Sequence, residues 1–281
     1  MNRILFAAAA ALSLYVTTGF AQETFPVWPD LAPGEKGDFP APKFTVYQPE
    51  KKTTDACVII CPGGGYKELV LGYEGEKIVN LFKEKGVTTV LLEYRVPRRE
   101  GVEKYRAAWQ DAQRTIKHVR QNAAKWGVDP EKIGMIGFSA GGHLTVLCSV
   151  NSQTPAYEPI DELDKVPCHL NFAIPVYPAY VLVDGENSPN ANKGIDSPMV
   201  KDFNFDDKCA PMCLIHGDDD WYSSLGSVAI YTQMKKKSVP MEMHIYVKTK
   251  HAFVKNPIGP HSGGWFDRSY EWMKVMGYGG E

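Results

Sequence analysis

Residues 137–143, with the sequence Gly-Phe-Ser-Ala-Gly-Gly-His, place a serine among small neighbours in the pattern of a nucleophile elbow. The segment follows an apolar run at 132–137 and precedes a helical pattern, so Ser139 is expected at a sharp turn between a strand and a helix. Small residues such as Gly137 and Ala140 let that turn close tightly and lift the hydroxyl into a cleft. The same residues also fit a glycine-rich turn whose serine caps the next helix. The choice between the two interpretations depends on whether catalytic partners occur elsewhere in the chain.

A nucleophilic serine needs a base that takes its proton and an acid that holds the base. His251 follows the last β-rich run and is the candidate base, with His261 as the fallback in a stretch rich in proline and glycine. Asp220 is the candidate acid, because it ends the acidic cluster 218–220 directly after the strand pattern at 212–216. A calcium loop is the competing interpretation of this cluster, but alternating ligands with a terminal glutamate are absent. Packing or hydrogen-bonding roles are expected for the other histidines near these motifs: His118, His143 and His216.

The run Cys-Pro-Gly-Gly-Gly-Tyr at 61–66 supplies candidate donors for a developing oxyanion. Three successive glycines let backbone N–H groups converge on a substrate oxygen without obstruction by side chains. The amides of Gly64 and Gly65, with that of Ala140 after the serine, are therefore the predicted oxyanion hole. A phosphate loop is the alternative, but the Gly-Lys-Ser/Thr ending of a Walker loop is missing.

The elements that must hold these residues alternate between short apolar runs and amphipathic stretches, which is typical of a mostly parallel sheet covered by helices on both faces. Strands are predicted at 44–48, 56–61, 87–94, 132–137, 169–176, 212–216 and 241–247. Helices are predicted at 75–85, 102–126, 144–150, 223–237 and 265–275. The polar stretch 178–208 has no periodicity and is expected to form a long loop or a small lid after a strand. No repeat or linker divides the chain, so one α/β domain is expected.

Residues 1–21 combine an early arginine, an apolar run and a small-residue ending, which predicts a cleaved signal peptide followed by a domain over 22–281. We therefore expect a periplasmic or secreted protein with no membrane attachment after cleavage. An uncleaved N-terminal anchor is the alternative, although the apolar run is short for a membrane span. No later segment has the pattern of a span.

The net charge of −2 at pH 7, with basic residues dispersed, disfavours nucleic acid as a partner. Cys57 and Cys61 lie about 13 Å apart on one predicted strand and cannot bridge each other. A pairing between segments, such as Cys148 with Cys168, stays open, although small buried thiols are the favoured interpretation. No Cys-x-x-Cys or His-Glu-x-x-His spacing occurs, so neither a metal site nor a cofactor is predicted.

The ordered motifs resemble those of the α/β-hydrolase superfamily, and more closely those of bacterial carbohydrate esterases of the acetyl-xylan-esterase and feruloyl-esterase-like kind. The resemblance runs over most of the mature chain and rests on the motifs at 26–29, 62–66, 93–95, 128–130, 137–143, 216–220 and 251–253. It implies the α/β-hydrolase fold and a triad of Ser139, Asp220 and His251. It also implies the oxyanion hole at Gly64, Gly65 and Ala140.

Two departures from the family pattern matter. Pro62 stands where many relatives have a histidine before the glycines, and Trp221-Tyr222 replaces the usual Val-Pro turn after the acid. Trp221 and Tyr66 are therefore candidate substrate-binding residues, because aromatic faces pack well on sugar rings, with core packing as the alternative for each. Arg95 is expected to form a structural ion pair.

The resemblance implies a serine esterase that removes acyl groups, foremost acetyl, from plant-type polysaccharides or oligosaccharides through an acyl-enzyme. A serine peptidase of the prolyl-oligopeptidase-like group shares the triad and is the first alternative. A catalytically inactive homologue that binds sugar is the second. The acyl group, the polysaccharide and the oligomeric state are not fixed by the sequence.

Overall fold

The computed structural model describes residues 22–183 and 197–280. The predicted signal peptide and the middle of the 178–208 loop lie outside these residues. No helix within the described ranges is long and apolar enough to cross a membrane.

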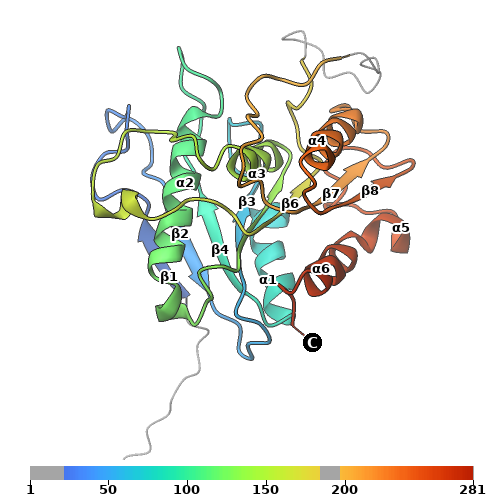
Figure 1. Cartoon of the computed structure of the whole chain (residues 1–281), viewed down its shortest axis with the longest axis horizontal. Coiled ribbons are helices and arrows are strands. Elements are labelled where there is room, and N and C mark those ends of the chain that lie inside the picture. The colour runs from blue at the N-terminus through green and yellow to red at the C-terminus, as the bar shows by residue number, and fades with distance from the viewer. Residues whose placement is uncertain (1–21, 184–196, 281) are drawn as a thin grey trace, which may run out of the picture.

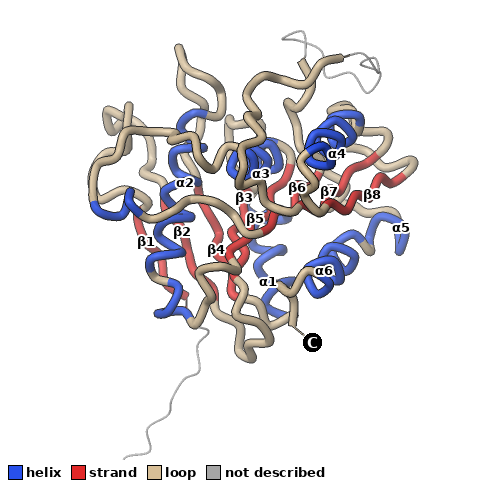
Figure 2. The backbone as a smooth tube through the Cα atoms, in the orientation of Figure 1, coloured by secondary structure: helices blue, strands red, loops and turns tan. Residues whose placement is uncertain are grey.

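Eight strands form one sheet in the order β1-β2-β4-β3-β5-β6-β7-β8, which crosses the molecule from β1 at the left to β8 at the right in Figure 2. The pairs β1–β2 and β2–β4 are antiparallel and all the others are parallel. The central strands are apolar and buried on both faces, as expected where helices cover a parallel sheet on both sides. The strands are β1 Gln22–Pro26, β2 Lys43–Tyr47, β3 Cys57–Cys61, β4 Thr88–Glu93, β5 Ile133–Phe138, β6 Phe172–Val176, β7 Met212–Gly217 and β8 Met241–Tyr246.

Helices cover both faces of this sheet (Figure 1). The core on one face includes side chains of α2 Arg106–Gln121, α3 Ala140–Val150 and α4 Leu225–Lys236. The core on the other face includes side chains of α1 Lys77–Glu84 and α6 Trp265–Val275. Short turns complete the set: a π turn Gly72–Glu76, 3-10 turns Ala123–Trp126 and Glu162–Lys165, and α5 Gly259–Gly263. The predicted mostly parallel sheet with helices on both faces, in a single domain, is confirmed.

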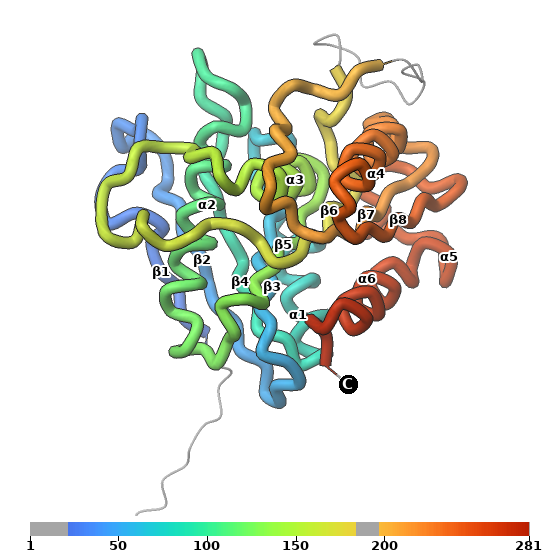
Figure 3. The backbone as a smooth tube through the Cα atoms, viewed as in Figure 1, coloured from blue at the N-terminus to red at the C-terminus, as the bar shows by residue number. Residues whose placement is uncertain are grey.

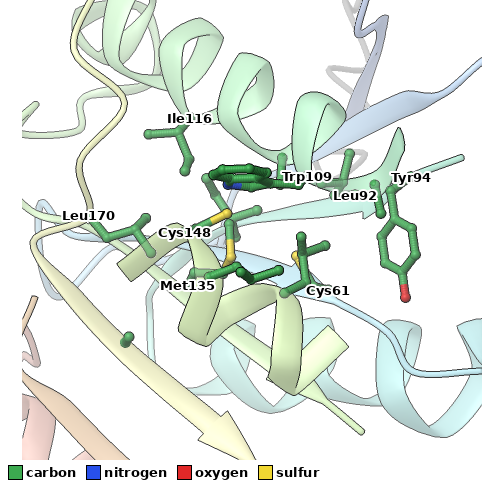
Figure 4. Packing of buried hydrophobic residues seen from close by; sticks show 14 of the residues in the cluster. Cys61, Leu92, Tyr94, Trp109, Ile116, Met135, Cys148 and Leu170 are labelled. Carbon is green, nitrogen blue, oxygen red and sulfur yellow. The ribbon is translucent and has the colours of Figure 1, made fainter. Parts of the chain in front are cut away.

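The larger core packs helix side chains against alternate residues of the strands. Figure 4 shows Trp109 of α2 beside Cys148 of α3, with Met135 and Cys61 on the strands beneath. All six cysteines belong to the described residues and are free, so Cys148 and Cys168 form no disulfide. Cys148 acts here as a small buried apolar group, the interpretation favoured from the sequence.

The long helix predicted at 102–126 is shorter than expected. The α-helix begins at Arg106 and ends at Gln121, where the Asn122 amide donates a hydrogen bond to the carbonyl of His118. A polar side chain that bonds its own backbone in this way competes with the helix. A 3-10 turn, Ala123–Trp126, follows the helix. Gly127 ends this turn, and its φ of 60° is the left-handed conformation that favours glycine.

The carboxyl ends of the parallel strands meet at one edge of the sheet, where ligands bind in open α/β folds. The segments that carry the predicted site residues leave β3, β5, β7 and β8 at this edge. Figure 3 follows the chain from the N-terminal strand at the left to α6 at the right, so these segments come from positions far apart in the sequence.

Candidate active site

Ser139 has the backbone of a strained elbow. Its φ of 53° and ψ of −114° fall in a region that residues with side chains rarely adopt. Backbone hydrogen bonds hold it there, because its N–H donates to Val176 and its carbonyl accepts from His143 and Ala179. A Cβ added to Gly141 would lie 2.0 Å from the carbonyl oxygen of Cys61, the residue at which the segment of the triglycine loop begins. Glycine is therefore required at position 141, because any side chain would collide with that backbone.

His251 and Asp220 complete a hydrogen-bonded chain with the serine. His251 Nε2 lies 2.8 Å from Ser139 Oγ, and its Nδ1 lies 2.7 Å from Asp220 Oδ2. Because an ionised carboxylate can only accept, Nδ1 carries the proton and Nε2 is free to accept the serine proton. The structure therefore brings together the three residues predicted for the triad, in the geometry that general-base activation of a serine requires.

Asp220 is buried and held by more than one donor. Its Oδ1 accepts a hydrogen bond from the Tyr222 amide at 2.7 Å, and His216 Nε2 lies 3.4 Å from its Oδ2. Burial alone would raise the pKa of Asp220, but the hydrogen bonds from His216 and His251 outweigh it and lower that pKa below its ordinary value. The carboxylate is therefore ionised where the base needs it.

His216 is a second imidazole beside the acid, and it forms hydrogen bonds, one of the roles expected for it from the sequence. It is fully buried, its Nε2 lies 2.8 Å from the carbonyl oxygen of Tyr222, and its Nδ1 lies 2.7 Å from Ser227 Oγ. A carbonyl only accepts, so the Nε2 proton points toward Tyr222 and Asp220. The signal in the sequence was its place at a strand end, four residues before the acid.

The triglycine loop presents free amides beside the elbow. Gly64 and Gly65 have φ values of +126° and +66°, conformations that favour glycine. A Cβ on Gly63 would lie 3.0 Å from Ser139 Cβ, so the loop runs directly against the nucleophile. Within the described residues, the N–H groups of Gly64, Gly65 and Ala140 donate to no protein acceptor. Unpaired backbone donors near a nucleophile are what an oxyanion hole requires.

Glu74 is a buried carboxylate behind this loop, and sequence reasoning missed it. It lies in the π turn Gly72–Glu76 and is 2% exposed. Its Oε2 accepts from the Gly63 amide at 2.8 Å and its Oε1 accepts from the Tyr177 hydroxyl at 2.9 Å. Nothing in the sequence separates it from the exposed Glu76 two positions on.

Aromatic rings surround His251 at the mouth of the site. The Trp221 ring lies 5.1 Å from the imidazole and is 48% exposed, and substrate contact by it stays a prediction. The Tyr222 ring lies 5.1 Å from the same imidazole and an equal distance from Tyr180. Tyr66, the other candidate binding residue, is only 1% exposed and its hydroxyl lies 2.9 Å from His143 Nδ1. Its burial favours the packing alternative, and substrate contact by Tyr66 stays a prediction.

One group of three possible metal donors occurs in the described part of the chain, at the edge formed by β7 and β8. It consists of Cys213, Glu242 and His244, whose ligand atoms lie within 4.8 Å of one another. His244 Nε2 already lies 2.8 Å from the Glu242 carboxylate. The search for sequence spacings missed this group because strand pairing, not proximity in the chain, places Cys213 beside Glu242. No member belongs to the Ser139 site.

Arg95 and Asp111 form the structural ion pair that the sequence predicted for the arginine. Arg95 Nε lies 2.9 Å from the carboxylate, and both side chains are buried. The same arginine contacts Glu35 at 3.0 Å, which ties the N-terminal segment to β4 and α2.

Comparisons with known proteins agree with this fold. The sequence model of the BD-FAE family matches residues 44–192, more than half of the chain. An acetylxylan esterase of Xylanibacter ruminicola is 24% identical over 221 residues, which are 74% of this chain and 42% of that protein. An endo-1,4-beta-xylanase B of Butyrivibrio fibrisolvens is 32% identical over 88 residues, covering 31% of this chain and 14% of that protein. The chain thus spans less than half the length of these curated relatives.

Solved structures extend the likeness in fold to nearly the whole chain. An acetyl ester-xyloside bifunctional hydrolase from Caldicellulosiruptor lactoaceticus superposes with a TM-score of 0.74 at 24% identity, covering 92% of this chain and 97% of that one. The apo form of Thermogutta terrifontis esterase 2 superposes with a TM-score of 0.71 at 23% identity, covering 92% and 96%. At these identities the likeness shows a shared α/β-hydrolase fold.

Proposed function

Because the chain belongs to the BD-FAE family, we propose that it is a serine esterase that hydrolyses ester groups, foremost acetyl groups, on plant-type polysaccharides or oligosaccharides. The observation that carries this proposal is the hydrogen-bonded chain from Ser139 through His251 to Asp220, beside unpaired amides of the glycine loop.

The geometry supports acyl transfer through a covalent intermediate. Ser139 Oγ attacks the ester carbonyl while His251 Nε2 takes its proton, and the amides of Gly64, Gly65 and Ala140 stabilise the oxyanion. The imidazolium then gives that proton to the leaving sugar oxygen, which leaves the acyl group on Ser139. Water, activated by the same imidazole, attacks the acyl carbonyl and releases the acid and the free serine. Asp220 holds the imidazole and stabilises its charged form throughout.

Two observations support an acylated carbohydrate as the substrate. Two of the relatives are named for acetylated xylan or xylosides. The half-exposed indole of Trp221 beside His251 offers an apolar face of the kind that packs on a sugar ring.

Replacement of the nucleophile tests the proposal directly. We expect Ser139→Ala to fold and to lose at least about 10³-fold in turnover of 4-nitrophenyl acetate and in acetate release from acetylated xylan, because no acyl-enzyme forms. Ser149→Ala, on helix α3 that directly follows Ser139, is the matched control and should keep its activity. Turnover by Ser139→Ala at the wild-type rate would refute the mechanism. Cleavage of aminoacyl amides without ester hydrolysis would favour a peptidase.

The predicted export is a separate proposal. We propose that residues 1–21 are removed during secretion and that the mature protein begins at Gln22. Cell fractionation followed by N-terminal sequencing checks both points. A cytoplasmic protein that retains residues 1–21 would contradict them.

A further inference from the structure

Glu74 contacts both the triglycine loop, which carries the predicted oxyanion donors, and Tyr177, which packs against the base His251. One carboxylate oxygen accepts from the amide of Gly63, the first residue of the triglycine run. The other accepts from the hydroxyl of Tyr177, which directly follows β6. The Tyr177 ring packs edge-on against the His251 imidazole, with ring centroids 4.9 Å apart. The buried Glu74 side chain thus bonds the oxyanion loop directly, and it is linked to the base His251 by Tyr177.

The contact with Gly63 pairs the first amide of the triglycine run and helps to hold the loop. Glu74 takes the N–H of Gly63, while the Gly63 carbonyl accepts from Val70 and the Gly64 carbonyl accepts from Lys67. These bonds fix the loop on both sides of its turn and leave the next two amides without protein partners. An oxyanion hole works because its donors are held in place before the reaction. Glu74 supplies one of the constraints that hold them.

The surroundings of Glu74 define its charge. The titratable groups that face it are Tyr73 on the π turn, Tyr94 after β4, Tyr177 after β6 and His251. Burial raises the pKa of Glu74 above its ordinary value, and the hydrogen bonds from Tyr177 and Gly63 and the charge of His251 offset only part of that rise. Burial, with the carboxylate beside it, also raises the pKa of Tyr177 well above its ordinary value, so its hydroxyl stays protonated and donates.

We propose that Glu74 is a positioning residue of the reaction, which orients the oxyanion amides through Gly63 and the His251 imidazole through Tyr177. The proposal rests on the function proposed above, because it concerns the same acyl transfer. A role in the reaction also explains why a carboxylate is buried at this position. Burying a charged side chain costs more free energy of desolvation than burying a neutral one of the same size. The π turn fits this role, since such turns are frequent at functional sites.

Three variants and a control test the proposal, each measured by the rate at which a fluorophosphonate labels Ser139 and by kcat and KM on 4-nitrophenyl acetate. We expect Glu74→Ala to lower the labelling rate and kcat about 10- to 100-fold with KM changed little, the range for groups that orient functional residues. Tyr177→Phe keeps the ring on His251 and should show a smaller loss. Glu76→Gln changes an exposed carboxylate of the same turn and should match the wild type.

Glu74→Gln separates positioning from a merely structural role. Because the charged form is disfavoured by burial, the neutral isostere should unfold at the same or a higher temperature while its kcat falls. The ratio of wild-type to Glu74→Gln activity should be largest at neutral pH. It should fall toward one as the pH drops through the raised pKa of Glu74, where the wild-type side chain also becomes neutral.

The outcomes are distinguishable from failure of the proposed function. If wild-type Ser139 neither reacts with the fluorophosphonate nor turns over esters, the esterase proposal fails and the role of Glu74 falls with it. If the wild type reacts with the fluorophosphonate, and Glu74→Ala and Glu74→Gln both react at the wild-type rate, only the positioning role is refuted. A ratio that does not change with pH, with a lowered unfolding temperature for Glu74→Gln, would also refute it.

Discussion

At the scale of single residues, Asp220 accepts hydrogen bonds from the His251 imidazole and the Tyr222 amide, and a second imidazole, that of His216, lies 3.4 Å away. Such a carboxylate does more than balance charge, because it fixes which nitrogen of His251 carries the proton. Its lowered pKa keeps it ionised down to pH values below those at which an ordinary aspartate protonates. Protonation of Asp220 therefore does not limit activity in mildly acidic solution.

Replacing this carboxylate by an amide should remove most of the activity and leave the fold intact. Asp220→Asn can offer an N–H to Nδ1 and so favours the tautomer whose Nε2 cannot accept the serine proton. We expect kcat on 4-nitrophenyl acetate to fall about 10³- to 10⁴-fold. Asp219→Asn, which changes the exposed neighbour, should keep wild-type kcat. Equal losses in the two variants would argue that the acidic cluster as a whole, and not Asp220, holds the base.

At the scale of elements, the oxyanion loop depends on glycines for two different reasons. A Cβ on Gly64 would lie 2.1 Å from the carbonyl oxygen of Glu68, which is backbone and cannot move aside. A Cβ on Gly101 would meet nothing within 4 Å, although its φ of +76° also favours glycine. Gly64 therefore has no room for a side chain, whereas at Gly101 a side chain would cause only conformational strain.

We expect Gly64→Ala to displace the loop and to lower kcat on 4-nitrophenyl acetate more than about 100-fold, the effect of losing an oxyanion donor. Gly101→Ala should cost about 1 kcal/mol of stability from strain and leave kcat unchanged. Steady-state kinetics and thermal unfolding of both variants check this pair. Wild-type kcat in Gly64→Ala would mean that the loop tolerates a side chain and is not the oxyanion hole.

The elements also show what a sequence can and cannot predict here. The triad residues were found because each lies within about five residues of the carboxyl end of a strand, and parallel strands bring their carboxyl ends to one edge. Glu74 and Tyr177 were not predicted, because they lie 103 residues apart in the chain and only the order of the strands in the sheet brings them into contact. The end of α2 was misjudged because Asn122 competes for the backbone, an effect that hydrophobic periodicity does not register.

At the scale of the whole molecule, the buried Arg95–Asp111 pair connects β4, α2 and the N-terminal segment. Asp111 also accepts from the Trp28 indole at 2.7 Å. Burial raises the pKa of Asp111, and the arginine offsets that rise only in part. Removing the carboxylate would leave a buried guanidinium without its closest counter-charge.

We expect Asp111→Ala to lower the free energy of unfolding by about 3–5 kcal/mol, the usual penalty for breaking a buried ion pair. Glu23→Ala removes one partner of the exposed pair with Lys125 and should change stability by less than about 1 kcal/mol. Chemical denaturation of both variants measures the difference. A change below about 1 kcal/mol in Asp111→Ala would mean that the arginine finds other acceptors.

The acid stability of the whole protein should depend on His143, which lies on α3 behind the elbow. Burial, with the charge of Lys104, lowers the pKa of His143 from 6.5 to about 3, and its Nδ1 lies 2.9 Å from the Tyr66 hydroxyl. In the unfolded chain the imidazole binds a proton below about pH 6.5, whereas in the folded chain it stays neutral until about pH 3. The unfolded state thus binds more protons in this window, so stability falls as the pH drops from 6.5 toward 3.

His143→Gln keeps a hydrogen-bonding group beside Tyr66 but cannot titrate. We expect it to be less stable than the wild type at pH 7, because packing is lost, and to lose less stability than the wild type between pH 7 and pH 4.5. Denaturant unfolding at the two pH values measures both differences. His261→Gln, at an exposed position, should follow the wild-type pH dependence. If His143→Gln loses as much stability in acid as the wild type, the acid sensitivity arises from carboxylates with lowered pKa values, such as Asp220, and not from this imidazole.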